Sequence, residues 1–217
     1  MMDFEAARTK MVDNQVRTTD VTSHSVLRAF YTVPREAFVP EKAQSLAYID
    51  ADIEIGAGRF LMEASPLAKL LQLGTITKED VVLEVGTSSG YATAILSMIA
   101  GSVVSVESDE ALAASATETL AKLGYDNVAV VSGPLEAGYA GEAPYDVIFV
   151  NGAVEEVPAA LLDQLRDGGR LIAVVGYGNA AQSKVFVREQ GIVSEGSFFN
   201  ASVKPLPGFR KAKEFVF

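Results

Sequence analysis

Cysteine is missing from this chain, and histidine occurs only once in its 217 residues. The lack of cysteine excludes disulfides, thiolate nucleophiles and cysteine-ligated zinc, and one histidine leaves no histidine-based set of metal ligands. No apolar run approaches the roughly 20 residues that span a bilayer, and the first residues lack the basic-then-apolar order of a signal peptide. We therefore expect no resident metal, no membrane association and a cytoplasmic location.

Positive charge is also scarce. Lysine and arginine together number 18 against 28 acidic residues, which gives a formal net charge of −10. Nucleic-acid-binding proteins usually carry a basic stripe that neutralises phosphates, so we expect no nucleic-acid partner. Hydrophobic residues make up 49% of the chain, which is enough to bury one core without covalent staples.

The most informative pattern is a strand, a glycine turn, a helix and a second strand. Residues 81–85 are apolar except for Glu84, and Gly86 and Gly90 bracket the turn. A helix is expected over residues 89–100, and the second strand ends on Glu107. In a parallel strand–helix–strand unit the turn lies at the carboxyl edge of the sheet, where the acid reaches ribose hydroxyls. The pattern predicts a site for an adenosine-containing cofactor; an ordinary strand-to-helix connection is the alternative.

Glycine spacing and charge indicate which cofactor this is. A dinucleotide turn reads G-x-G-x-x-G, whereas Ser88 stands between Gly86 and Gly90 here, and no phosphate-binding lysine follows. Glu84, just before the turn, would repel a phosphate but suits a cationic sulfonium. These residues favour S-adenosylmethionine, with candidate contacts from Glu84, Gly86, Thr87, Ser88, Gly90, Tyr91, Glu107 and Ser108.

From residue 79 onward, strands and helices alternate as in an open α/β sheet. Helices are expected from the Ser108–Asp109 cap to residue 123 and over residues 158–165. The later strands are expected over residues 127–132, 145–150, 169–175, 184–188 and 197–203. Because few residues separate the last strands, we expect a closing hairpin that places an antiparallel strand at one edge.

The first 78 residues have a different character. Helical spacing occurs over residues 4–16 and 23–30, and a further helix over residues 65–73 is expected to be capped by Ser65. We interpret residues 1–78 as an N-terminal helical appendage and substrate-loop region over the carboxyl edge of the sheet. Residues 79–217 are then the S-adenosylmethionine-binding core.

Several segments occur in an order and spacing typical of one family. They include Val-Pro-Arg-Glu-Ala-Phe-Val-Pro at residues 33–40, Gly-x-Gly at 56–58, the glycine turn at 83–91, and Leu-Gly-Tyr-Asp-Asn-Val at 123–128. Over nearly its whole length the chain resembles the protein-L-isoaspartate O-methyltransferase family. The resemblance implies a three-layer Rossmann-like α/β fold with a seven-stranded, mostly parallel sheet and an antiparallel last strand.

The resemblance also implies an activity, which is protein repair by methylation of the exposed carboxylate of isoaspartyl residues. The donor would be S-adenosylmethionine, and the product S-adenosylhomocysteine. A carboxylate is already ionised at neutral pH, so it needs no general base. Near the adenine, the family's Gly-Asp-Gly is replaced by Gly133, Pro134 and Leu135, and a further departure falls at Asn151. These four residues are also candidates for binding the cofactor.

The acceptor-binding segment departs most from the family. Where the family has Gln-Thr-Ile-Ser-x-Pro, residues 59–64 read Arg-Phe-Leu-Met-Glu-Ala. Phe60 and Met62 cannot donate the hydrogen bonds of a hydroxyl, and Glu63 would repel a carboxylate unless it points away. The candidates for this acceptor loop are Arg59, Phe60, Met62 and Ser65.

Two interpretations stay open. In one, Arg59 or backbone amides take over carboxylate binding, and the protein remains an isoaspartyl methyltransferase with altered residues. The expected partner is a protein, a peptide or a small carboxylate substrate. In the other, the chain binds S-adenosylmethionine but methylates a different acceptor, or it is a non-catalytic interaction protein.

Overall fold

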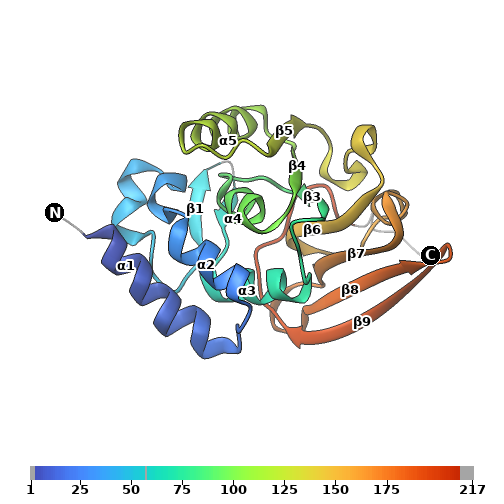
Figure 1. Cartoon of the computed structure of the whole chain (residues 1–217), viewed down its shortest axis with the longest axis horizontal. Helices are drawn as coiled ribbons and strands as arrows, with labels where there is room; N and C mark the ends of the chain where they lie inside the picture. Colours follow the sequence, from blue (N-terminus) through green and yellow to red (C-terminus); the bar gives the residue numbers. More distant parts are fainter. Residues whose placement is uncertain (1–2, 57, 211–217) are drawn as a thin grey trace, which may run out of the picture.

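A seven-stranded sheet forms the middle of the molecule (Figure 1). The computed structural model describes residues 3–56 and 58–210. The strands follow the order β5-β4-β3-β6-β7-β8-β9, and β3, β4, β5, β6 and β7 are parallel. Their bounds are β3 Val81–Val85, β4 Ser102–Glu107, β5 Val128–Ser132, β6 Tyr145–Val154, β7 Leu165–Val175, β8 Gln182–Glu189 and β9 Ile192–Asn200.

The last two strands close the sheet as an antiparallel hairpin. β8 runs antiparallel to β7, and β9 runs antiparallel to β8. Together with the parallel body of the sheet, this hairpin confirms the predicted fold class.

Helices cover both faces of the sheet. The longer ones are α1 Phe4–Met11, α2 His24–Thr32, α3 Ala64–Leu73, α4 Tyr91–Ile99 and α5 Glu110–Lys122, and α6 Ala159–Leu162 is short. A two-stranded hairpin of β1 Ile53–Gly56 and β2 Arg59–Leu61 precedes α3. Short helical turns are η1 Val12–Val16, η2 Arg17–Thr19, η3 Arg35–Phe38, η4 Glu41–Leu46, η5 Leu135–Ala137, η6 Ala140–Glu142 and η7 Gly178–Ala180. Within the described ranges, no helix is both long and apolar enough to cross a membrane.

Successive side chains along the strands belong in turn to two separate apolar clusters, one on each face of the sheet. Val82 of β3 packs with α2, α3 and α4, whereas its neighbour Leu83 packs with Leu161 of α6 on the opposite face. This follows from the period of two along a strand, which sends successive side chains to opposite faces. The sheet is therefore buried on both sides, as expected of a parallel sheet.

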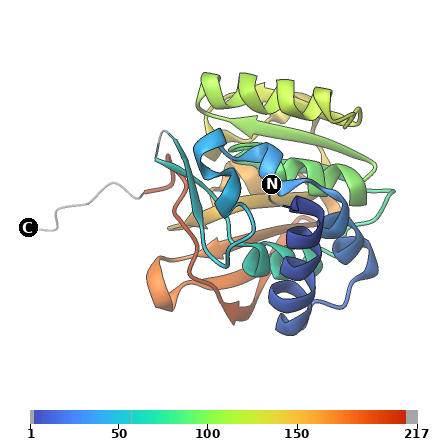
Figure 2. The ribbon, with the colours of Figure 1, turned by 90° about the vertical axis from the view of Figure 1, so that its left-hand side faces the viewer.

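Helix α4 lies between the sheet and the N-terminal helices (Figures 1 and 2). Eight of its nine residues are buried. Tyr91, at its first position, makes edge contacts with Phe30 and Phe38 at centroid distances of 6.1 and 5.8 Å. A helix that is apolar all round needs such cover on every side.

Three local predictions were wrong. The helix expected over residues 158–165 is only α6, because Leu165 already belongs to β7. The last strand ends at Asn200, and residues 201–209 leave the hairpin and run beside the end of β6. Helix α3 begins at Ala64, so Ser65 does not cap it; the Ser65 hydroxyl instead donates to Thr19 Oγ1 at 3.0 Å.

Candidate functional site

The glycine turn after β3 curls over the neighbouring strand. The amides of Gly86 and Thr87 both donate to the carbonyl of Val106 in β4, at 2.9 and 3.2 Å. Gly86 and Gly90 have φ angles of 96° and 91°, in the region that favours glycine. The turn therefore reaches the carboxyl ends of β3 and β4 together, as the sequence predicted.

Ser88 occupies the middle of the turn and is also left-handed, with φ of 57°. This conformation costs a residue with a Cβ roughly 1–2 kcal/mol. Its hydroxyl donates to the carbonyl of Phe60 at 3.2 Å, which ties the turn to β2.

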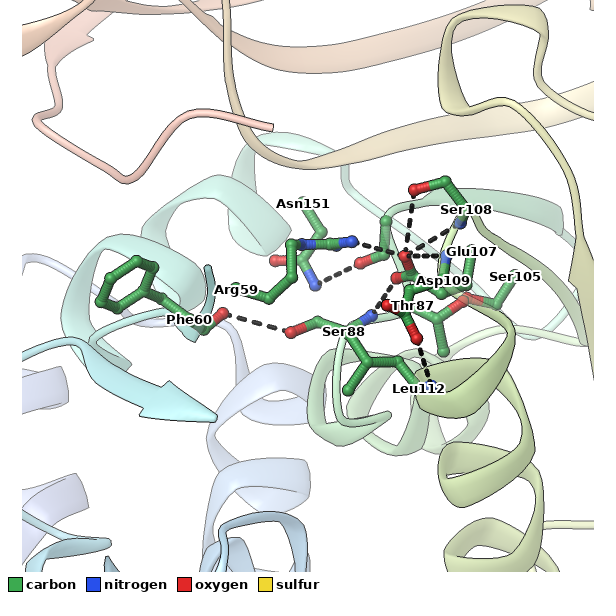
Figure 3. Close-up of polar contacts among 11 residues, drawn as sticks. Arg59, Phe60, Thr87, Ser88, Ser105, Glu107, Ser108, Asp109, Leu112 and Asn151 are labelled. Carbon is green, nitrogen blue, oxygen red and sulfur yellow. Dashed lines mark hydrogen bonds and ion pairs between the residues drawn. The ribbon is translucent and has the colours of Figure 1, made fainter. Parts of the chain in front are cut away.

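Glu107, at the end of β4, gathers donors from three elements (Figure 3). Its Oε2 accepts from the amide of Ser88 at 2.7 Å. Its Oε1 accepts from the amides of Ser108 and Asp109 at 2.9 and 3.1 Å, and from the guanidinium of Arg59. The carboxylate is fully buried, so these contacts hold a negative charge where the pattern predicted one.

Arg59 comes from the β1–β2 hairpin, 48 residues before Glu107 in the chain. Only 6% of the arginine is exposed, and the ion pair is screened from solvent. Its Nη2 has no hydrogen-bond partner among residues 3–56 and 58–210. The guanidinium that the sequence offered as a partner for the acceptor thus lies against the strand-end acid.

Glu84, the acid before the turn, is surrounded by neutral donors. Its Oε2 accepts from Thr93 at 2.5 Å and from Ser105 at 2.7 Å, and its Oε1 accepts from Asn151 Nδ2 at 3.0 Å. Burial raises the pKa of Glu84 to about 7, although these hydrogen bonds oppose the shift. Asn151 Nδ2 also reaches the carbonyl of Gly86 at 3.1 Å, so Glu84 braces the turn from inside.

Arg35, which was not among the predicted site residues, anchors the acceptor segment. Arg35 is completely buried and donates to the carbonyls of Ala47 and Met62, both at 2.7 Å. Its guanidinium also lies 4.8 Å from the centre of the Tyr91 ring. Met62 is buried, while the Phe60 ring lies 5.0 Å from Lys204 Nζ.

Glu63, the acid of the acceptor segment, lies near two further carboxyls. Its amide donates to Asp52 Oδ1 at 3.0 Å. Burial, followed by hydrogen bonding and charge repulsion from Asp50, raises the pKa of Glu63 to about 7. A protonated Glu63 would repel an acceptor carboxylate less than an ionised one.

The structure brings most of the predicted site residues to one edge. Gly133 follows β5 and donates its amide to the Glu107 carbonyl at 2.9 Å, next to the exposed Pro134 and the buried Leu135. Two predicted residues point elsewhere: Ser65 bonds Thr19, and the Tyr91 ring packs against the N-terminal helices.

Two contacts at the site were not predicted. Ser105 bonds both Glu84 and Thr87, and its signal in the sequence was a hydroxyl between the valines of an expected strand. Leu206 packs over Gly86, and no local pattern marked it.

The fold and the strand-end acids define the class as a Rossmann-like methyltransferase. A model of the family described as protein-L-isoaspartate(D-aspartate) O-methyltransferase matches residues 6–201. The chain belongs to this family, whose members are S-adenosylmethionine-dependent methyltransferases.

Individual relatives agree with this assignment. The chain is 40% identical over 185 residues to protein-L-isoaspartate O-methyltransferase 2 of Shewanella sediminis, covering 85% of this chain and 76% of the relative. A solved protein-L-isoaspartate O-methyltransferase superposes with a TM-score of 0.82 at 26% identity, covering 93% of this chain and 67% of that one. A Plasmodium falciparum protein, described as a putative member in complex with S-adenosyl-L-homocysteine, shares the fold at 17% identity and a TM-score of 0.78, covering 96% and 100%.

Proposed function

We propose that this chain transfers a methyl group from S-adenosylmethionine to the carboxylate of isoaspartyl residues in proteins or peptides. The family match over residues 6–201 carries the proposal. In the reaction, an acceptor oxygen forms a bond to the methyl carbon while the carbon–sulfur bond breaks, which gives a methyl ester and S-adenosylhomocysteine. An anion and a cation become two neutral groups, so a site that excludes water favours the step.

The residues at the turn fit the donor chemically. A carboxylate accepts hydrogen bonds from hydroxyls, so Glu107 would hold the ribose hydroxyls, with the amides of Ser88 and Ser108 nearby. The Ser89 hydroxyl supplies an unused group at the same turn, since it is buried with no partner among the described residues. Gly133, Pro134 and Leu135 would flank the adenine beyond the end of β5.

The acceptor segment favours a second candidate, which is methyl transfer to a different acceptor. Phe60 and Met62 offer no hydroxyl, and Arg59 is engaged with Glu107. Carboxylate binding then depends on backbone amides or on movement of Arg59. The donor site is the same for either acceptor, so a transfer assay has to distinguish an isoaspartyl substrate from another carboxylate.

The test is transfer of a tritiated methyl group from S-adenosylmethionine to an isoaspartyl peptide, with the matching aspartyl peptide as control. We expect base-labile methyl ester on the isoaspartyl peptide alone. A double variant, Phe60→Thr with Met62→Ser, restores two hydroxyls and should raise the rate. Donor binding without transfer by the wild type, rescued in the double variant, would instead support the second candidate. Absence of donor binding in every variant would contradict both.

A further inference from the structure

Two distant segments of the chain meet at Gly86. A Cβ built on this glycine would lie 3.0 Å from Leu206 Cδ2 and 3.3 Å from Arg59 Nη2. A glycine at this place in a nucleotide-binding turn allows a ligand to approach the backbone closely. In this structure the chain's own side chains take that space.

Arg59 holds its place through one charged contact. Its Nη1 pairs with Glu107, the acid that would hold the ribose, while Nη2 is buried and unpartnered among the described residues (Figure 3). A buried donor without a hydrogen-bond partner destabilises the position that leaves it unpaired. The closed position of Arg59 therefore combines a buried ion pair with a donor that has no partner among the described residues.

Leu206 is delivered by the segment that leaves the last strand, residues 201–209. The amide of Ala153 donates to the Lys204 carbonyl, and the amide of Leu206 donates to the Ala153 carbonyl, both at 2.9 Å. Leu206 also covers Gly152, where an added Cβ would lie 2.7 Å from its Cγ. Leu206 is only 6% exposed and belongs to the same apolar cluster as Leu135, which borders the expected adenine side.

The neighbouring space under the acceptor segment is also closed. Phe60, Met62, Ser88 and Asn151 are among the residues that enclose it, and it has no room for a water-sized molecule. Residues 201–209 meet both neighbours, since Leu206 packs over Gly86 and Lys204 Nζ lies 5.0 Å from the centre of the Phe60 ring.

We propose that Arg59 and Leu206 form a clasp over the donor site. The donor binds when Arg59 leaves Glu107 and Leu206 leaves Gly86, so the closed form competes with binding. This inference rests on the proposed function, because it takes S-adenosylmethionine as the donor. If only a fraction of the molecules is open, the apparent association constant is the intrinsic one multiplied by that fraction.

The first test is calorimetric titration of the full chain with S-adenosylhomocysteine. Arg59→Gln removes the ion pair, and we expect it to bind about tenfold more tightly than the wild type, with about threefold for Leu206→Ala. Matched controls are Arg166→Gln, which breaks an ion pair with Asp146 at 2.7 Å away from the turn, and Val203→Ala in the same segment as Leu206. The controls should leave the affinity unchanged.

The second test measures hydrogen exchange in the wild type. The amides of Ala153 and Leu206 are bonded in the closed form, so S-adenosylhomocysteine should speed exchange at these two amides. Equal affinities in the wild type and both clasp variants, with unchanged exchange, would overturn the clasp and leave the proposed function intact. If no variant binds S-adenosylhomocysteine, both the clasp and the proposed donor are overturned.

Discussion

Two glutamates stand near the ends of neighbouring parallel strands, and their surroundings differ. Glu84 of β3 and Glu107 of β4 are both fully buried. Glu84 meets only neutral partners, two hydroxyls and an amide. Glu107 meets an arginine and three backbone N–H groups.

The difference shows that partners, more than burial, decide what a buried acid does. Charged donors and backbone N–H groups stabilise an anion more than neutral hydroxyls do. Glu84, whose pKa is raised to about 7, stabilises the turn through its hydrogen bond with Asn151. Glu107 is a carboxylate at the edge of the sheet, where a ligand's hydroxyls would compete with Arg59 for its oxygens.

The largest effect is expected at Glu107. Glu107→Gln leaves the buried guanidinium of Arg59 without its counter-charge, so we expect the free energy of unfolding to fall by about 3 kcal/mol. Urea denaturation at pH 7 measures it. Glu195→Gln is the control, because its pair with Lys184 is on the surface and should change stability by less than about 1 kcal/mol. If Glu107→Gln lowers the free energy of unfolding as little as the control does, the proposed difference between Glu107 and Glu84 is wrong.

The second prediction concerns Glu84 and pH. Its pKa is raised from 4.5 to about 7, so the folded state holds this proton more tightly than the unfolded state does. Its contribution is therefore fully favourable below about pH 4.5 and is lost as the pH rises through about 7. Glu84→Gln stays neutral, so we expect it to match the wild type at pH 5 and to be more stable by about 2 kcal/mol at pH 8.

Thermal or urea denaturation of both proteins at the two pH values measures this difference. Glu63, whose pKa is also raised to about 7, titrates equally in both proteins and cancels. If the variant is less stable than the wild type at pH 8, Glu84 is better held as an anion than its neutral partners indicate.

The smallest effect is expected at Ser105, which donates to Glu84. Ser105→Ala should cost about 1 kcal/mol at pH 5. The cost should be larger at pH 8, because this hydrogen bond favours the ionised form of Glu84 and lowers its pKa. The same denaturation series measures it, with Ser102→Ala in the same strand as control. If the cost of Ser105→Ala is the same at both pH values, the Ser105 hydrogen bond does not favour the ionised form of Glu84.

Local patterns were sufficient for the sheet and the turn. The apolar runs of β3 and β4 and the glycines at 86 and 90 are properties of neighbouring residues, and they located Glu107 at the edge. The antiparallel closing hairpin followed from the short connection between β8 and β9. These features need no knowledge of distant parts of the chain.

The contacts of Arg59 and Leu206 could not be predicted in this way. Arg59 reaches Glu107 across 48 residues, and this depends on the path of the β1–β2 hairpin. Leu206 lies in a segment where a strand was expected until residue 203, and it is fixed by bonds to β6. Periodicity reports which face a residue takes within its own element, but not which distant element it meets.

Helix α4 has a consequence for how the chain folds. Its apolar residues face the sheet on one side and α2 on the other, so neither the N-terminal helices nor the sheet completes its burial alone. The glycine turn ends at Gly90, the N-cap of this same helix. Opening of the N-terminal layer would expose α4 to water, so order at the turn and cooperativity of the whole fold are linked through one helix.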